Sequence, residues 1–374
     1  MIPHAGLERR IVAALEATPP RIPVMLGGCG TGRTTALHAL VDRLGRDQCQ
    51  YIDIERAAST PERFLRAISS SSPFPSAPVE APRSAREAFE LTLAHFANAR
   101  SAERPVTFLL DEVLELRTFE SFPGLRHVLR ELLHALSDSE NRFVLSSRYV
   151  ARAHRLLRDG AAHFEVIHLP ALSPAEVNGM LPPLGETAIE DREFLSRTIQ
   201  ALSDGRASYV HALSEATAGS SGRAGDPISA LTALLTADGA LTAWCGYRYE
   251  LRLHRARGYG ALKAILEILA EEEPLTLTEI AQRLHRTPGS TKDYLSWLED
   301  VDLVVARQKR YSFGDPLLRL WVRLHCRPIP PGVDEVAREV QNYALARLPQ
   351  AEPSLAMVGA GAGERKGWGI IEID

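Results

Sequence analysis

Residues 22–35 read IPVMLGGCGTGRTT, a short apolar run followed at once by a glycine-rich loop. The helical pattern TALHALVDRL begins at the end of this loop. A glycine-rich turn between a buried strand and a helix directs backbone N–H groups toward an anion. The spacing of Gly27, Gly32 and Thr34 matches the phosphate-loop pattern GxxxxGK[ST], with Arg33 where lysine is expected. The sequence therefore predicts a phosphate-binding loop.

Within this loop, the Thr34 hydroxyl is expected to bind Mg²⁺. A guanidinium is planar and longer than an ammonium, so Arg33 can neutralise phosphate but also crowd the metal. The first 262 residues contain no lysine that could replace it. Two hypotheses stay open: a loop that binds and hydrolyses ATP, and a loop that only binds it. The predicted nucleotide-binding residues are Gly27, Gly28, Cys29, Gly30, Thr31, Gly32, Arg33, Thr34 and Thr35.

A second motif, VTFLLDEV at residues 106–113, is an apolar strand that ends in two acids. Asp111 is expected at the carboxyl end of the sheet, where it can hold Mg²⁺. Glu112 is then placed to orient or deprotonate an attacking water. The alternative is a strand that simply ends in a solvated acidic turn.

The fold class follows from the order of the patterns. Nearly continuous apolar runs alternate with amphipathic helical patterns, which predicts an α/β domain with a parallel sheet covered by helices on both faces. From Ser173 to about Leu253 helical patterns dominate, which predicts an all-α region. The predicted strands are 22–26, 50–54, 106–110, 142–146 and 164–169. The predicted domains are 1–170 (nucleotide-binding), 171–255 (lid), 256–328 (winged helix) and 329–374 (a helix and a glycine-rich tail).

The winged helix is predicted from three helical patterns followed by a strand pair. Thr276 and Glu279 form a capping-box pattern for the second helix, and residues 290–300 form the third. Residues 283–310 contain six Lys/Arg against four Asp/Glu, a small surplus for phosphate contacts. The domain could therefore bind DNA, or instead bind protein partners or its own core. The predicted DNA-contacting residues are Arg286, Thr287, Ser290, Thr291, Lys292, Arg307, Lys309 and Arg310.

The phosphate loop, FLLDEV and FVLSSR (143–148) together resemble the nucleotide-binding core of AAA+ and STAND-class ATPases. The resemblance is closest to the prokaryotic "archaeal ATPase" group, which resembles origin-recognition ATPases. It covers about residues 5–328, and Arg33 departs from the family pattern. It implies that Ser147 and Arg148 lie beside the γ-phosphate. It also implies a second sensor arginine at Arg206, and an intersubunit arginine finger among Arg152, Arg155 and Arg158.

Composition limits the remaining possibilities. The chain has 374 residues, is 45% hydrophobic and carries a formal net charge of −4, so any basic surface for DNA must be local. No apolar stretch is long enough for a membrane span, and the four cysteines form no CxxC, which favours the cytoplasm. We therefore expect a cytoplasmic, ATP- and Mg²⁺-binding switch that acts on double-stranded DNA and can self-associate. The alternative is a nucleotide-binding signalling or scaffold protein with little or no hydrolysis.

Overall fold

The computed structural model describes residues 5–75, 81–158, 163–182, 189–218, 225–256 and 258–348. The predicted glycine-rich tail lies outside these residues. The first layer of the fold is a five-stranded sheet in the order β2-β5-β6-β1-β7, with every neighbouring pair parallel. The five predicted strands are confirmed to within two residues at each end. The strands are β1 (Ile22–Leu26), β2 (Cys49–Asp53), β5 (Thr107–Asp111), β6 (Arg142–Ser147) and β7 (Phe164–His168).

The register of the sheet brings the two nucleotide motifs together. Leu26 pairs with Ser147, and Asp53 pairs with Asp111, so these strands end at the same edge. The phosphate loop follows β1 and the acid pair ends β5, with β6 between them. The predicted meeting of the loop and the acids is therefore a consequence of the strand order.

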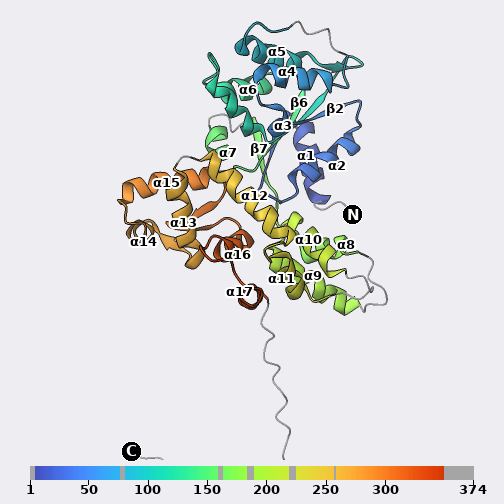
Figure 1. Cartoon of the computed structure of the whole chain (residues 1–374). Helices are drawn as coiled ribbons and strands as arrows, with labels where there is room; N and C mark the ends of the chain where they lie inside the picture. Colours follow the sequence, from blue (N-terminus) through green and yellow to red (C-terminus); the bar gives the residue numbers. More distant parts are fainter. Residues whose placement is uncertain are drawn as a thin grey trace, which may run out of the picture.

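Both faces of this sheet are buried, which explains the continuous apolar strands. Met25, Leu109 and Val144 pack with helices α1 and α2 on one face, whereas Val24 and Leu110 join the core on the other face. Figure 1 shows α1 and α2 on one side of the sheet and α4, α5 and α6 on the other, where they cover the second face. The elements are α1 (Ala5–Glu16), α2 (Arg33–Leu44), α3 (Ile54–Ala57), α4 (Pro61–Ser70), α5 (Ala85–Asn98), the 3₁₀ helix η1 (Val113–Ser121), α6 (Val128–Ser137), α7 (Val150–Leu157), and the hairpin β3 (Arg100–Ser101) and β4 (Arg104–Pro105).

The helical region that follows the sheet begins with a capping box. The Ser173 side chain accepts from the Glu176 amide, and the Glu176 side chain accepts from the Ser173 amide. The last of these helices, α12, is long and runs toward the C-terminal domain (Figure 1). The helices are α8 (Pro174–Met180), α9 (Ile189–Ser203), α10 (Ala207–Thr217), α11 (Pro227–Leu234) and α12 (Ala240–Arg255).

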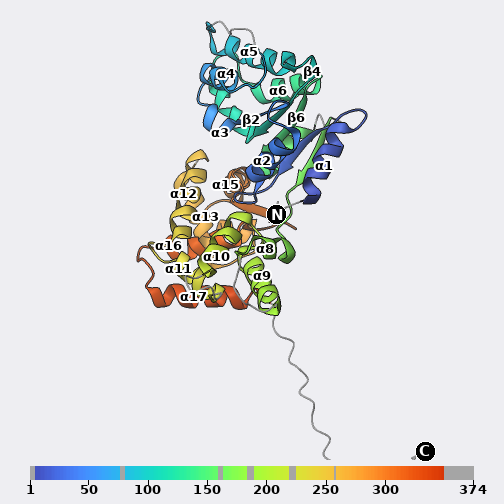
Figure 2. The same cartoon turned by 90° about the vertical axis from the view of Figure 1, so that its right-hand side faces the viewer.

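The C-terminal domain is a winged helix, as predicted. The capping box of Thr276 and Glu279 is present, and Gln308 and Lys309 take left-handed backbone conformations in the turn of the wing. A two-residue strand, β8, completes a three-stranded sheet and was not predicted. Figure 2 shows α17 beneath α11 and α16. The elements are α13 (Tyr259–Glu271), β8 (Leu275–Thr276), α14 (Leu277–Arg283), α15 (Pro288–Asp300), β9 (Val304–Arg307), β10 (Arg310–Phe313), α16 (Pro316–His325) and α17 (Val333–Leu345).

Among the described helices, none combines the length and the apolar character that a membrane crossing requires.

Candidate nucleotide site

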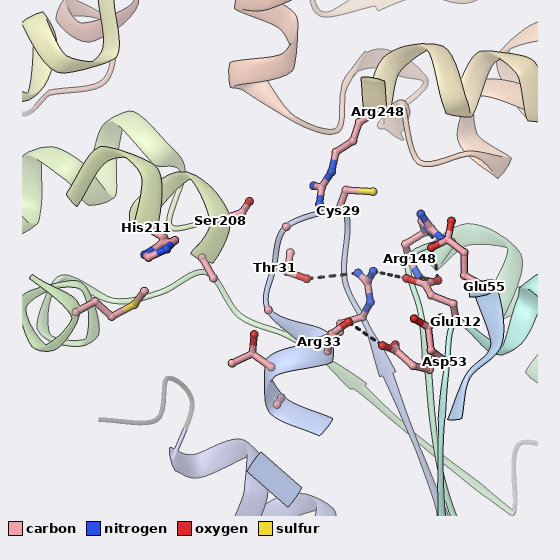
Figure 3. Close-up of a pocket in the computed structure, with 18 residues that line it drawn as sticks. Cys29, Thr31, Arg33, Asp53, Glu55, Glu112, Arg148, Ser208, His211 and Arg248 are labelled. Carbon is pink, nitrogen blue, oxygen red and sulfur yellow. Dashed lines mark hydrogen bonds and ion pairs between the residues drawn. The ribbon is translucent and has the colours of Figure 1, made fainter. Parts of the chain in front are cut away.

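A cavity of about 550 Å³ opens at the carboxyl edge of the sheet, between the phosphate loop and the helices of the lid. Figure 3 shows its walls: the loop in the centre, the acidic residues on the right, Ser208 and His211 of α10 on the left, and Arg248 of α12 above the loop. Its volume is within the range of small-molecule sites. The lining residues are Cys29, Gly30, Thr31, Gly32, Arg33, Thr34, Thr35, Ala36, Asp53, Glu55, Asp111, Glu112, Arg148, Met180, Ala207, Ser208, His211 and Arg248.

The phosphate loop has the backbone that an anion site needs. Gly30 and Gly32 have φ of 80° and 95°, a left-handed conformation that favours glycine. Gly32 is the N-cap residue of α2 and has no side chain that could occupy the first amides of the helix. Within the described chain, the first-turn amides of α2 have no hydrogen-bond acceptor, so they are free to donate to a phosphate.

The predicted metal ligands, Thr34 and Asp111, are in contact. Thr34 Oγ1 donates to Asp111 Oδ2 at 2.7 Å, and the Tyr51 hydroxyl donates to the same oxygen at 2.9 Å. Ser146 donates to the other carboxylate oxygen. A hydroxyl beside a buried carboxylate is a donor set that suits Mg²⁺, which takes its remaining ligands from phosphate and water. The two residues therefore fit the predicted metal.

Arg33 points into the loop and bridges it to the acid pair. Its Nη1 donates to the carbonyls of Gly27 and Gly28, the latter at 2.6 Å, and its Nη2 pairs with Glu112 Oε1 at 2.6 Å. Figure 3 shows the guanidinium between Thr31 and Glu112. A lysine has no second arm to make this bridge. Binding of phosphate by Arg33 stays a prediction.

Glu112 is held by arginines at both carboxylate oxygens. Oε2 accepts from the Arg148 amide at 3.1 Å and lies 3.2 Å from Arg148 Nε, while Arg33 holds Oε1. Burial alone would raise the pKa of this carboxyl. The charges of Arg33 and Arg148 have the larger, opposite effect, so the pKa lies below its ordinary value. Glu112 lines the cavity with both carboxylate oxygens engaged by arginines, and its predicted role toward an attacking water stays a prediction.

Arg148 lines the cavity within a chain of ion pairs, and its place beside a γ-phosphate stays a prediction. It contacts Glu55 and lies 3.2 Å from Glu115. Arg255, the last residue of α12, joins the same two carboxylates, with Nη2 at 3.1 Å from Glu55. The neighbouring Ser147 is fully buried and accepts from the Tyr149 amide, so it does not line the cavity.

Arg206 does not line the cavity, although it contacts the phosphate loop, and its role as a second sensor stays a prediction. Its Nη1 donates to Cys29 O at 3.1 Å and lies 3.6 Å from Asp315, and its Nη2 donates to Gly314 O. The buried Asp315 carboxylate attracts the guanidinium away from the cavity. Arg206 therefore joins the phosphate loop to the winged helix.

Two arginines of α12 were missed by the sequence analysis. Arg248 lines the cavity with its guanidinium 3.5 Å from the ring centroid of Trp244, and Arg252 is buried with Nη1 3.1 Å from Asp302 O. Their spacing of four residues places them on one face of the helix. Burial would raise the pKa of the nearby Cys29 thiol, but the surrounding charges, Arg252 first and Arg248 next, lower it overall.

The predicted DNA-contacting residues lie on the outer surface, with one exception. Thr291 is 0% exposed and donates to Thr287 O at 3.0 Å, so it packs in the core and cannot contact DNA. Ser290 is partly buried and Arg310 donates to Pro274 O at 3.1 Å. The exposed residues are Arg286, Thr287, Lys292, Arg307, Lys309 and Arg310.

The three finger candidates differ in their surroundings. Arg155 on α7 pairs with Asp300 at the end of α15, so it is engaged within its own chain. Arg152 lines a second cavity between α7 and α15, and Arg158 is exposed. The choice among Arg152, Arg155 and Arg158 stays a prediction.

The strand order, the phosphate loop after β1 and the acid pair after β5 define the fold of AAA+ P-loop ATPases, here followed by a winged helix. This confirms the predicted fold class and, at the level of fold, the predicted resemblance. A family model described as winged helix-turn-helix DNA-binding matches residues 261–305.

Among solved structures, the Walker-type ATPase PABY2304 of Pyrococcus abyssi is similar with a TM-score of 0.66 and 18% identity, over 86% of this chain and 96% of that chain. The Orc1 protein of Aeropyrum pernix in complex with DNA has a TM-score of 0.45 and 17% identity, over 93% and 95%. The Thermotoga maritima RuvB branch migration motor has a TM-score of 0.42 and 14% identity, over 83% and 92%. The comparison with curated proteins gives no match.

Proposed function

We propose that this protein is an ATP-binding switch whose nucleotide state controls the winged helix, and that the winged helix binds double-stranded DNA. The observation that carries the proposal is the position of Arg206. One guanidinium donates both to Cys29 O in the phosphate loop and to Gly314 O in the winged helix. A phosphate that reshapes the loop must therefore alter a contact of the winged helix.

In this proposal the loop residues and the acids divide the work of binding. The free amides of the loop and of the first turn of α2 hold the phosphates. Thr34 and Asp111 hold Mg²⁺, which neutralises phosphate charge when bound. The cavity beyond the loop has room for the rest of the nucleotide.

Hydrolysis depends on the release of Glu112. A phosphate group competes with the Glu112 carboxylate for the Arg33 guanidinium, because both are oxyanions that pair with it. Once one carboxylate oxygen is free, Glu112 can accept a proton from water. The bridge in Figure 3 therefore competes with phosphate even when nucleotide is bound, and this competition keeps turnover low.

The DNA contact in this proposal uses the exposed half of the winged helix. Arg286 lies just before α15 and Lys292 lies in its first two turns, and the wing adds Arg307 and Lys309, all of them exposed. The other end of α15 packs on α7 through the ion pair of Asp300. The basic half therefore faces outward while the other half stays attached to the ATPase core.

A test of the DNA contact is the triple variant Arg307→Ala/Lys309→Ala/Arg310→Ala. We expect the slope of log affinity against log salt to fall by about 2 to 3, because each lost phosphate contact removes roughly 0.9. The measurement is fluorescence anisotropy of a short labelled duplex over a series of salt concentrations.

The matched control replaces three exposed arginines of the core and lid by alanine: Arg46, Arg56 and Arg197. This control should keep the wild-type slope. If both triple variants show the wild-type slope, the wing does not contact DNA.

If the wild type does not bind the duplex even at low salt, the alternative is favoured, in which the winged helix binds protein.

The switch itself is tested by DNA affinity in the absence of nucleotide and with saturating MgADP or MgATP. The proposal requires calorimetric binding of MgATP and a DNA affinity that changes with the nucleotide. Binding of ATP with one constant DNA affinity contradicts the coupling.

A further inference from the structure

Two buried polar groups without a partner face the phosphate loop from the lid side. They are Ser208 Oγ, in the first turn of α10, and Arg248 Nη1, on α12. Both residues line the cavity, and Figure 3 shows Ser208 to the left of the loop and Arg248 above it. Buried polar groups without partners are uncommon, and one explanation for them is a ligand.

Both groups converge on Gly30. A Cβ atom at this position would lie 3.2 Å from Arg248 Nη1 and would collide with Ser208 Oγ. The Ser208 amide donates to Gly30 O at 3.0 Å, which fixes α10 against the loop. The loop, the hydroxyl and the guanidinium therefore meet at one point, where glycine leaves space.

The charges at this point are unbalanced. Arg33, Arg148 and Arg206 each pair with a carboxylate. Arg248 also lines the cavity, yet it has no carboxylate within ion-pair distance among the described residues. Burial lowers its pKa, and the charge of Arg252 lowers it further. A half-buried guanidinium with a buried, unpaired Nη1 and no anion is costly, and a bound anion removes that cost.

The orientation of Arg248 is fixed before any ligand arrives. Its guanidinium lies over the ring of Trp244, with 3.5 Å from Cζ to the ring centroid. Such stacking holds the plane of the guanidinium while its N–H groups stay available. A hydroxyl and a fixed guanidinium are both donors to a tetrahedral oxyanion.

We propose that Ser208 and Arg248 form an oxyanion subsite for the phosphates of the nucleotide beyond the α-phosphate. The inference rests on the proposed function, because it assigns a part of the same ligand. It goes further because it places α12, the helix that leads into the winged helix, in direct contact with the phosphates through Arg248. Through Arg248, the lid and α12 close on a diphosphate or triphosphate and not on a monophosphate.

The test titrates the full chain with MgATP, MgADP, AMP and inorganic phosphate by calorimetry. The variants are Arg248→Met, which keeps apolar contact with Trp244, and Ser208→Ala. Loss of the ion pair and hydrogen bond from the guanidinium is expected to weaken ATP and ADP about 10- to 100-fold in Arg248→Met, and loss of a hydrogen bond from an uncharged donor about 3- to 10-fold in Ser208→Ala. AMP affinity should stay unchanged. The control, Tyr247→Ala, alters an exposed neighbour on α12 and should behave as wild type.

A second readout is thermal unfolding. Without ligand, Arg248→Met should melt no lower than the wild type, since it removes an unbalanced buried charge. With MgATP, its melting temperature should rise less than that of the wild type.

The outcomes separate the two proposals. A wild type that binds neither ATP nor ADP overturns the proposed function. Normal ATP affinity in both variants overturns the subsite alone. If AMP affinity falls as much as ATP affinity, Arg248 contacts the nucleoside or the α-phosphate. If inorganic phosphate binds as tightly as ATP, the subsite binds a free anion. Either result overturns the inference. If Arg248→Met does not fold, Ser208→Ala decides alone.

Discussion

Arg33→Lys is expected to raise the rate of phosphate release from MgATP by about 10- to 100-fold. Loss of one charge-assisted hydrogen bond to Glu112 raises the fraction of molecules with a free Glu112 carboxylate oxygen by about this factor. In the wild type, one arm of Arg33 holds the loop carbonyls and the other holds Glu112 Oε1. A lysine has a single ammonium, so it can keep the loop contact while the carboxylate oxygen becomes free. The measurement is phosphate release at saturating MgATP, with calorimetry to confirm that ATP affinity stays similar.

The control is Glu112→Gln in the Arg33→Lys background. If the released carboxylate acts as the base, this second change should remove the gained turnover, by about 100-fold or more, with ATP still bound. Arg46→Lys, a matched change at an exposed arginine, should have no effect. Equal turnover of wild type and Arg33→Lys would mean that the Glu112 bridge does not limit hydrolysis. A gain that survives Glu112→Gln would assign the chemistry to another group.

The parallel sheet could be predicted from the sequence because its strands are buried on both faces. Residues 106–110 are apolar at nearly every position, and so are residues 142–146 after the first. Once these strands are placed, the acids at 111 and 112 must lie at the carboxyl edge. The two-residue strand β8 has no such pattern, since it exists only because the wing folds beside it.

The place of Thr291 could also have been predicted. Thr291, Leu295 and Leu298 are four and three residues apart, which puts them on one face of α15, and all three are buried. The polar side chain hid this periodicity, because threonine at a helix start is also a common DNA contact. The helical spacing carried more information than the residue type.

The direction of each arginine could not be predicted in the same way. Arg206 turns toward Asp315, and Arg252 contacts the backbone of Asp302, so the partners of both are decided by residues of another domain. Arg33 turns toward Glu112, 79 residues away in the chain. Periodicity describes the face of one element and contains no information about which distant carboxylate packs against it.

The second large effect is expected for Asp315→Ala, which should lower the free energy of unfolding by about 3 to 5 kcal/mol. Asp315 is 4% exposed and accepts from the amides of Leu317 and Leu318 at the start of α16, at 3.1 and 3.2 Å. It also accepts from the Tyr209 hydroxyl at 2.8 Å and faces Arg206. Alanine removes the carboxylate that faces the buried Arg206 guanidinium. It also leaves the Tyr209 hydroxyl and the first amides of α16 without this acceptor.

Urea unfolding followed by circular dichroism measures this change. Asp315→Asn keeps an acceptor oxygen for the helix cap but lacks the charge, so its loss should be smaller than that of alanine. Asp334→Ala, at an exposed position in the first turn of α17, is the control and should cost less than about 1 kcal/mol. An equally small loss for Asp315→Ala would show that this junction does not stabilise the chain.

The same residue then tests the coupling at a temperature where Asp315→Asn stays folded. With the charge of Asp315 gone, Arg206 keeps only its carbonyl contacts to Cys29 and Gly314. The link between the phosphate loop and the winged helix should weaken, because an ionised partner roughly doubles the strength of such a contact. We therefore expect Asp315→Asn to bind MgATP and duplex DNA separately but to show a smaller change of DNA affinity on addition of MgATP. A change as large as in the wild type would mean that the nucleotide signal reaches the winged helix by another route. The contacts of Arg248 and Arg255 support α12 as that route.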